Sequence, residues 1–411
     1  MKYLILLGDG MADFPIAELG GKTPLEYART PNMDWMASHG TVGRIDTIPH
    51  GFKPGSDVAT LSVLGYNPAE SYSGRGPLEA ANMGVQMAPQ DVAFRCNLVT
   101  IAEADGRSVM DDFTAGHIPS DESRRIIEDI HRELGNEEFQ FYPGVGYRHL
   151  CVWRGGSEDV LTTPPHDISG KAIDPYLPQG AAAAPLLRLM ELSRDFLARH
   201  PVNRRRTDAG RKAANSIWLW GQGRAPAFER LTERYRLDGG GVISAVDLLN
   251  GIGVYAGLEV IRVEGATGYT DTNYAGKAQK ALEHLDRLSF IFLHVEAPDE
   301  MGHEGNLRGK IKAIEDFDEQ VVGTVLKGVK SHPEYRIMVL SDHPTPISIK
   351  THSADPSPFA VFSSKSGENL RNAAAFGESQ ARQAGILVSP GHRLLGMFLG
   401  DWRGRIEKEL H

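Results

Sequence analysis

Residues Ser289–His303 have the sequence SFIFLHVEAPDEMGH. The run from Ser289 to Leu293 is short and apolar, and it predicts a buried strand. Asp299 and His303 follow this strand on a turn that contains glycine and proline. A carboxylate and an imidazole at this spacing can bind one divalent cation, because oxygen and imidazole ligands both suit zinc or manganese. Taken alone, the stretch favours a simpler interpretation, in which Asp299 caps the next helix and His303 is solvated.

The length and charge of the chain limit its class. A chain of 411 residues is too long for one ordinary core and predicts two domains. Its 41% hydrophobic and 24% charged residues are typical of a soluble globular protein. The formal net charge of -9 argues against nucleic acid or an anionic membrane as a partner. An anionic substrate would therefore be held by a few local arginines and lysines or by metal ions.

The cysteines and the N-terminus indicate where the protein works. Cys96 and Cys151 are too few for a disulfide framework or a cysteine-based zinc site, and they fit a reducing compartment. The apolar run Tyr3–Leu7 is too short for a signal peptide, and no run is long enough to cross a bilayer. We expect a cytoplasmic protein. The sequence does not decide whether the chain forms a homo-oligomer.

Two more apolar runs end in residues that can bind a metal. Tyr3–Leu7 is followed by Asp9, which lies between two glycines, and Arg336–Leu340 is followed by Asp342 and His343. Unbroken apolar runs predict central parallel strands buried on both faces. In an open doubly wound sheet, ligands bind beyond the carboxyl ends of such strands. We therefore expect an α/β fold with a doubly wound, mostly parallel sheet, although a single aspartate between glycines is often only a turn residue.

Ser56 follows a Pro-Gly break and begins a short predicted helix. The free N–H groups at a helix start favour an anion, so Ser56 is either an ordinary N-cap or a nucleophile that accepts a phosphoryl group. His352 precedes a last predicted strand, Phe359–Phe362. Three aspartates, three histidines and one serine suffice for two divalent ions close together. We favour this interpretation, because the alternative requires six unrelated explanations at once.

Residues 84–211 differ in character from the rest, being rich in charge and without long apolar runs. We interpret them as a smaller inserted α/β domain, which caps a substrate held by a core made of residues 1–83 and 212–411. The run 251–261 predicts a further core strand. Some polar side chains could contact a small anionic substrate, and each could equally be a solvated loop residue. These candidates are Arg75, His117, Arg148, His149, His166, Lys171 and Lys277.

Six motifs occur in order along almost the whole chain. They are Gly8–Met11, Gly55–Ala59, Gly74–Ala80, Ala297–His303, Ser341–His343 and Thr351–Pro356. In this order and with this insertion, the chain resembles the archaeal-type, cofactor-independent phosphoglycerate mutases of the alkaline phosphatase superfamily. The resemblance implies that Ser56 is phosphorylated transiently. It also implies one metal ion bound by Asp9, Ser56, Asp342 and His343, and another bound by Asp299, His303 and His352.

The activity implied by the resemblance is the interconversion of 3-phosphoglycerate and 2-phosphoglycerate through a phosphoserine, without 2,3-bisphosphoglycerate. We expect two divalent ions, with manganese as the first choice and zinc or magnesium as alternatives. The partner would be a small phosphorylated substrate. Because the metal centre does not identify the phosphoryl acceptor, a homoserine kinase of the same superfamily is the main alternative. The absence of a P-loop sequence favours the mutase. A non-catalytic metal-binding protein is a minor alternative.

Overall fold

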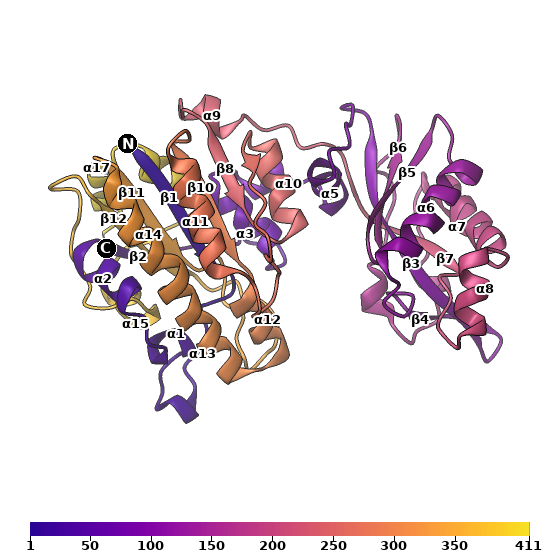
Figure 1. The fold of residues 1–411 in the computed structure, drawn as a ribbon, viewed down its shortest axis with the longest axis horizontal. Coiled ribbons are helices and arrows are strands. Elements are labelled where there is room, and N and C mark those ends of the chain that lie inside the picture. Colours follow the sequence, from indigo (N-terminus) through magenta and orange to yellow (C-terminus); the bar gives the residue numbers. More distant parts are fainter. Residues whose placement is uncertain (411) are drawn as a thin grey trace. The chain divides into compact units, whose positions relative to one another are not determined.

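The computed structural model describes residues 1–410, which form two compact units (Figure 1). The first unit combines Met1–Tyr72 with the chain from Phe228 onward, and the second unit is Ser73–Ala227. The insertion is therefore longer at both ends than the predicted 84–211. The helix Arg75–Asn82 and the strand Ser216–Gly223 both pack on the strand Val92–Ala104 of the second unit. A change of composition along the sequence does not reveal this packing.

The first unit is built on an eight-stranded sheet. Only β12 runs antiparallel to both of its neighbours, and the remaining pairs are parallel, which confirms the predicted fold class. In spatial order the strands are β13 (Leu387–Val388), β2 (Thr41–Ile45), β12 (Ser357–Ser363), β11 (Tyr335–Leu340), β1 (Lys2–Gly8), β10 (Phe290–Val295), β8 (Gly240–Ile243) and β9 (Glu259–Val260).

The centre of this sheet is buried on both faces. Leu4, Leu6, Ile5 and Leu7 of β1 are all fully buried, which explains the unbroken apolar run. Leu6 pairs in register with residues of β10 and β11, so these three strands end together at one edge. Figure 1 shows α11, α13 and α14 covering one face of the sheet.

The helices of the first unit are mostly short. They are α1 (Pro24–Tyr27), α2 (Pro31–His39), α3 (Ser56–Val63), α4 (Pro68–Ser71), α9 (Leu231–Arg234), α10 (Asp247–Tyr255), α11 (Tyr274–Leu285), α12 (Ala297–Glu304), α13 (Leu307–Asp316), α14 (Gly323–Gly328), α15 (Glu378–Gln383), α16 (Arg393–Leu399) and α17 (Trp402–Ile406). A π-helical turn, Phe317–Val322, joins α13 to α14. The predicted strand at 251–261 is wrong, because α10 occupies its first half and only β9 is extended. An apolar run with glycines fits a buried helix as well as a strand.

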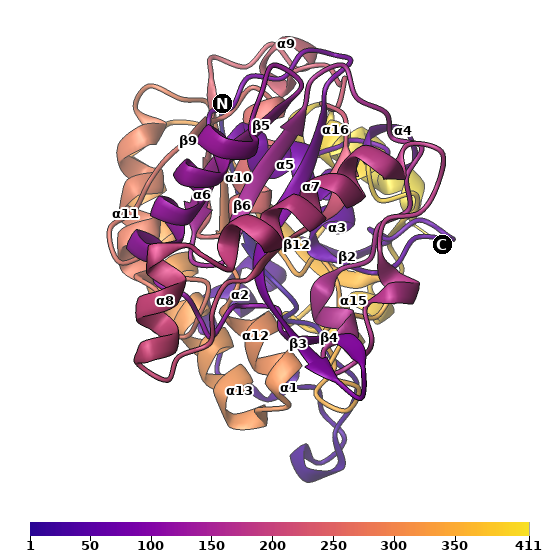
Figure 2. The ribbon, with the colours of Figure 1, turned by 90° about the vertical axis from the view of Figure 1, so that its right-hand side faces the viewer.

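The second unit is an antiparallel sheet with helices on both faces. Its strands are β4 (Arg107–Asp112), β3 (Val92–Ala104), β6 (Arg148–Trp153) and β5 (Phe139–Val145), with β7 (Ser216–Gly223) also paired to β3. Figures 1 and 2 show α6 (Ser120–Leu134), α7 (Ala183–Leu197) and α8 (Pro201–Asp208) on one face. On the other face, Ala80 of α5 (Arg75–Asn82) packs with Ala93, Leu150 and Val152.

In both units, every helix within residues 1–410 is too short or too polar to cross a bilayer.

Candidate metal centre

The ligand-type side chains gather at the edge of the first unit's sheet where β1, β10 and β11 end. Asp9 directly follows β1, and Asp342 lies two residues after the end of β11. His352 reaches the same edge because β12, which it precedes, runs in the opposite direction and begins there. Ser56 opens α3, which follows the parallel strand β2. Strand direction therefore explains why residues far apart in the sequence meet at one place.

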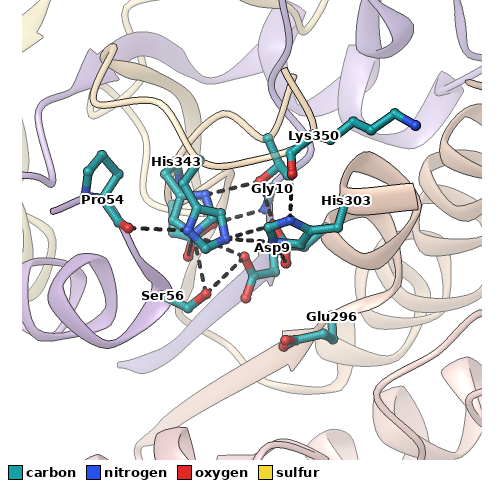
Figure 3. Close-up of polar contacts among 12 residues, drawn as sticks. Asp9, Gly10, Pro54, Ser56, Glu296, His303, His343 and Lys350 are labelled. Carbon is teal, nitrogen blue, oxygen red and sulfur yellow. Dashed lines mark hydrogen bonds and ion pairs between the residues drawn. The ribbon is translucent and has the colours of Figure 1, made fainter. Parts of the chain in front are cut away.

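One group of ligands surrounds the Ser56 hydroxyl (Figure 3). The Ser56 Oγ lies 3.2 Å from Nε2 of His343 and 3.5 Å from Oδ1 of Asp9. The same His343 Nε2 lies 3.4 Å from Oδ1 of Asp9 and 3.4 Å from Oδ2 of Asp342. This Asp342 Oδ2 is buried and has no hydrogen-bond donor among the described residues. A buried carboxylate oxygen without a donor is costly unless a cation binds it.

The helix geometry shows that Ser56 does not act as an N-cap. Gly55 occupies the cap position of α3, and no side chain caps the helix. The Ser56 hydroxyl points instead toward His343 and Asp9 (Figure 3). Of the two interpretations that the sequence left open, the geometry therefore excludes the N-cap.

A second group of ligands comprises Asp299, His303 and His352. The His303 Nε2 lies 3.1 Å from Oδ2 of Asp299, and the His352 Nε2 lies 3.5 Å from Oδ1 of the same carboxylate. The two imidazole Nε2 atoms are only 2.9 Å apart. Asp299 and His303 lie one helical turn apart on α12, where the sequence predicted only a turn.

The hydrogen bonds of the three histidines determine which ring nitrogen is free. Nδ1 of His303 lies 3.1 Å from the carbonyl oxygen of Lys350, and Nδ1 of His352 lies 3.2 Å from that of Pro54. A carbonyl oxygen only accepts hydrogen bonds, so each Nδ1 carries a proton, and in the neutral ring Nε2 keeps the lone pair that a metal needs. Two lone pairs facing each other beside a carboxylate are favourable only around a cation. The donor set therefore fits a metal ion.

His343 follows the same rule. Its Nδ1 lies 3.3 Å from Oγ1 of Thr345, and that hydroxyl donates its own proton to Oδ1 of Asp299. The Thr345 oxygen must then accept from Nδ1, which leaves the His343 Nε2 lone pair directed at Ser56 and Asp9. Thr345 thus links the two ligand groups and fixes the ring between them.

Gly10 allows this close packing. Its φ of 58° lies in the left-handed region, and its N–H donates to Oδ1 of Asp342 at 3.1 Å. A Cβ at this position would lie 2.5 Å from Oγ1 of Thr345 and 2.6 Å from Oδ1 of Asp299. Glycine is therefore required both by the backbone conformation and by the space available.

The electrostatics of the site are those of a cation site. Burial, together with the charges of Asp342 and Glu296, raises the pKa of Asp9 well above its ordinary value. Burial would also raise the pKa of Asp299, but His303 and His352, when protonated on both ring nitrogens, donate hydrogen bonds that hold it well below its usual range. Three carboxylates and a deprotonated serine carry four negative charges, which two divalent cations would neutralise.

Comparison with known proteins agrees with this geometry. Residues 37–203 match the family model of 2,3-bisphosphoglycerate-independent phosphoglycerate mutase. A probable mutase of this kind from Geobacter sulfurreducens is 55% identical over 97% of this chain and 100% of its own length. The mutase of the same name from Methanosarcina barkeri is 53% identical over 97% of this chain and 99% of its own. The chain belongs to this family.

Solved structures also match this member of the phosphoglycerate mutase family over nearly its full length. The PH0037 protein from Pyrococcus horikoshii has a TM-score of 0.81 and 31% identity, covering 98% of this chain and 97% of its own. The cofactor-independent phosphoglycerate mutase from Thermoplasma acidophilum has a TM-score of 0.67 and 28% identity, covering 97% and 100%. The family and the donor set together point to divalent metal ions at this centre.

Three residues of the centre were not predicted from the sequence. His294 is fully buried, and its Nε2 lies 2.8 Å from Oδ2 of Asp9. Glu296 lies near the same ring, with its Oε2 3.4 Å from that Nε2. Thr345 links Asp299 to His343. The order His-Val-Glu at the end of β10 could have indicated His294 and Glu296, because alternate residues of a strand point to the same face.

The predicted substrate contacts have varied locations. In the first unit, Lys277 is fully buried and its Nζ donates to the carbonyl oxygen of His294 at 3.2 Å. In the second unit, His149 is almost fully buried, and its Nδ1 accepts from the N–H of Gly144. This burial leaves His149 no access to a substrate. His117 and Lys171 are exposed, and Lys171 lies over the Tyr176 ring.

The other predicted contacts lie close enough in the second unit to influence one another's charge. Burial lowers the pKa of His166, Asp167 opposes this, and Arg95 and Arg75 lower it further. Burial also lowers the pKa of Arg95, and the neighbouring charges of Arg75 and Arg148 add to the effect although Glu79 opposes it. The Arg95 guanidinium lies 4.3 Å from the ring centre of Trp220. No sequence pattern singles out Arg95, which lies within β3.

Proposed function

We propose that this chain interconverts 3-phosphoglycerate and 2-phosphoglycerate, with Ser56 as the nucleophile that carries the phosphoryl group. The observation that supports it best is the position of the Ser56 hydroxyl. It lies among Asp9, Asp342 and His343, at the start of a helix that it does not cap. A serine in such a setting suits phosphoryl transfer rather than structural metal binding.

The residues for two divalent ions are those of the two ligand groups. Asp9, Ser56, Asp342 and His343 would bind one ion, and Asp299, His303 and His352 would bind the other. When bound, the ions would stabilise the deprotonated serine and the charge on the transferring phosphoryl group. Manganese is our first choice, because carboxylate and imidazole ligands suit it, with zinc and magnesium as alternatives.

The reaction begins when Ser56 Oγ attacks the phosphorus of 3-phosphoglycerate. The serine loses its proton, the bond to the substrate's 3-oxygen breaks, and that oxygen takes up a proton. The glycerate then turns so that its 2-hydroxyl attacks the phosphoserine, loses its proton and releases Ser56, which is protonated again. No phosphoryl group or proton is gained or lost over the cycle, so the reaction needs no 2,3-bisphosphoglycerate.

The free N–H groups at the start of α3 supply part of the anion binding. Ser56 is its first residue, and the helix is eight residues long. The partial positive charge at a helix N-terminus stabilises a phosphate attached there. His343, held by Thr345, fixes one side of the hydroxyl, and Asp9 fixes the other.

We propose that the second unit supplies the contacts to the substrate's carboxylate and caps it against water. Arg75, Arg95, Arg148 and His166 support this, because their positive charge exceeds that of the neighbouring Glu79 and Asp167, and a substrate carboxylate would balance the excess. Arg95 replaces His149 in this proposal, since His149 is buried. Exclusion of water would prevent hydrolysis of the phosphoserine.

A direct assay separates the mutase from the homoserine kinase. Purified protein with Mn²⁺ should convert 3-phosphoglycerate to 2-phosphoglycerate without added 2,3-bisphosphoglycerate, and should not phosphorylate homoserine with ATP. The relatives described above, at 53% and 55% identity, are both named mutases, which favours this outcome. Phosphorylation of homoserine without mutase activity would contradict the proposal, and the absence of both reactions would favour a non-catalytic metal-binding protein.

A further inference from the structure

A fully buried lysine, Lys310, lies in the first turn of α13. Its Nζ donates to the carbonyl oxygen of Ala12 at 3.2 Å, to that of Thr345 at 2.8 Å and to Oδ2 of Asp13 at 2.8 Å. An ammonium has three N–H groups, so these three acceptors use all of them. The geometry therefore indicates a charged lysine paired with Asp13. Removing two charges from water costs much of what their attraction supplies, so this pair by itself adds little net stability.

Lys310 joins the two loops that follow the central strands β1 and β11. Ala12 and Asp13 lie on the first loop, and Thr345 and Ile347 lie on the second. The loops also contact each other directly. The N–H of Thr345 donates to the carbonyl oxygen of Ala12 at 3.1 Å, and the N–H of Ile347 donates to Oδ2 of Asp13 at 3.1 Å. Lys310 thus holds both loops from a third segment, the helix α13.

The loop at Thr345 has little room to move. Its carbonyl oxygen accepts from Lys310 and lies against α12, where a Cβ on Gly302 would come within 2.5 Å of it. The hydroxyl of the same residue donates to Oδ1 of Asp299 and lies 3.3 Å from Nδ1 of His343. Asp299 belongs to one ligand group and His343 to the other. The position of the Thr345 backbone therefore determines how these two ligands are held relative to each other.

We propose that Lys310 is a positioning residue of the metal centre. By holding the Thr345 carbonyl, it places the Thr345 hydroxyl between Asp299 and His343 and keeps both ligand groups ready for their ions. It does not act on the substrate, because the side chain is fully buried and all three N–H groups are used within the protein. The inference rests on the proposed two-ion centre and adds a residue outside both ligand groups that determines its affinity for metal.

The test measures the affinity for Mn²⁺ rather than activity. Lys310→Met removes the ammonium and nearly preserves the length of the side chain, so the Thr345 carbonyl loses its donor. Calorimetric titration of the full chain, after chelation of its metal, should show Mn²⁺ binding about 10- to 100-fold weaker than in the wild type, the usual effect of removing a group that orients metal ligands. Lys312→Met is the matched control. Lys312 lies on the same helix, is exposed and pairs with Asp316, so its loss should leave Mn²⁺ affinity unchanged.

A charge-balanced variant separates positioning from simple ion pairing. In Lys310→Met, Asp13 stays buried without its cation, and the protein should lose stability for that reason alone. Lys310→Met combined with Asp13→Asn removes both charges and should recover much of this stability in thermal unfolding. Its Mn²⁺ binding should stay weak, because Thr345 still lacks its donor. This variant also serves if Lys310→Met folds poorly, and wild-type Mn²⁺ affinity in it would overturn the inference.

A double-mutant cycle tests whether Lys310 acts through Thr345. Thr345→Val replaces the hydroxyl by a methyl group and should weaken Mn²⁺ binding on its own. Added to the charge-balanced variant, it should weaken binding little further, because both changes remove the same link between the ligand groups. Losses of affinity that multiply would show that Lys310 acts independently of Thr345 and would also overturn the inference.

The results distinguish this inference from the proposal on which it rests. Fewer than two Mn²⁺ ions per chain in the wild type would overturn the two-ion centre and the inference with it. Two ions in the wild type, bound with equal affinity by the folded Lys310 variants, would overturn the inference and leave the centre intact. A purely structural role for Lys310 would change the unfolding temperature without changing the affinity of the folded protein for Mn²⁺.

Discussion

Replacement of Ser56 by alanine should abolish catalysis while leaving the fold almost intact. The change removes one hydroxyl, whose contacts are His343 at 3.2 Å and Asp9 at 3.5 Å. Because Gly55 is the N-cap and Ser56 caps nothing, the helix loses no cap. We expect the free energy of unfolding to fall by about 1 kcal/mol or less, the net value of one ordinary hydrogen bond.

The catalytic loss should be far larger. A covalent route has no substitute for its nucleophile, so we expect the rate to fall on the order of 10⁴-fold or more, equivalent to about 5 kcal/mol in the barrier. The assay is the mutase reaction with saturating Mn²⁺. In parallel, enzyme incubated with substrate is quenched, and the phosphate is located by peptide mass spectrometry, which should find it on Ser56 in the wild type only.

Ser62, on the same helix, offers a matched control. It is buried, and its hydroxyl donates to the carbonyl oxygen of Thr47 at 2.5 Å. Ser62→Ala leaves this oxygen without its donor and should cost about 1–3 kcal/mol of stability, yet phosphate should still appear on Ser56. Near-normal turnover by Ser56→Ala, or phosphate on another residue of the wild type, would refute the reasoning.

Four other results should follow from the structure. Chelation should abolish activity and Mn²⁺ should restore it, and a fully active sample with fewer than two ions by metal analysis would contradict the two-ion centre. His303→Ala should lose metal and turnover but unfold cooperatively, because its side chain is 34% exposed; unchanged turnover per folded molecule would show that His303 is not a ligand. Burial lowers the pKa of His149 to about 3, so the unfolded chain, with a pKa near 6.5, binds the extra proton at mildly acidic pH. Denaturant unfolding should therefore show about 2 kcal/mol less stability from this group at pH 5 than at pH 7, a loss that His149→Gln should remove. Limited proteolysis should cut near Ser73 and Ala227, where the two units join, and substrate should slow it; equal protection with and without substrate would argue against a hinge.

The central strands and the gathering of ligand-type residues at their ends could be predicted from the sequence alone. An unbroken apolar run predicts a strand buried on both faces, and β1, β10 and β11 confirm it. The ligand-type residues follow these strands directly, and in a parallel sheet the strand ends share one edge. Asp9, Asp299 and Asp342 could therefore be predicted to meet without knowledge of any contact.

Only the tertiary structure decided which atoms face one another across that edge. Proton positions on His343 and His294 depend on Thr345 and Ser244, whose hydroxyls reach the rings through loop geometry that no spacing encodes. Lys277 is an unremarkable helical lysine in the sequence, and it becomes a buried cation only because α11 packs against β10.

The bounds of the second unit could not be predicted from the sequence, because they too depend on tertiary contacts. The strand at 216–223 is as apolar as a core strand, and composition assigned it to the core. In the structure it is β7, paired with β3 of the second unit. A hydrophobic pattern records that a strand is buried, but the partner that buries it is chosen by pairing between distant segments. Such pairing depends on the packing of the whole chain rather than on local sequence.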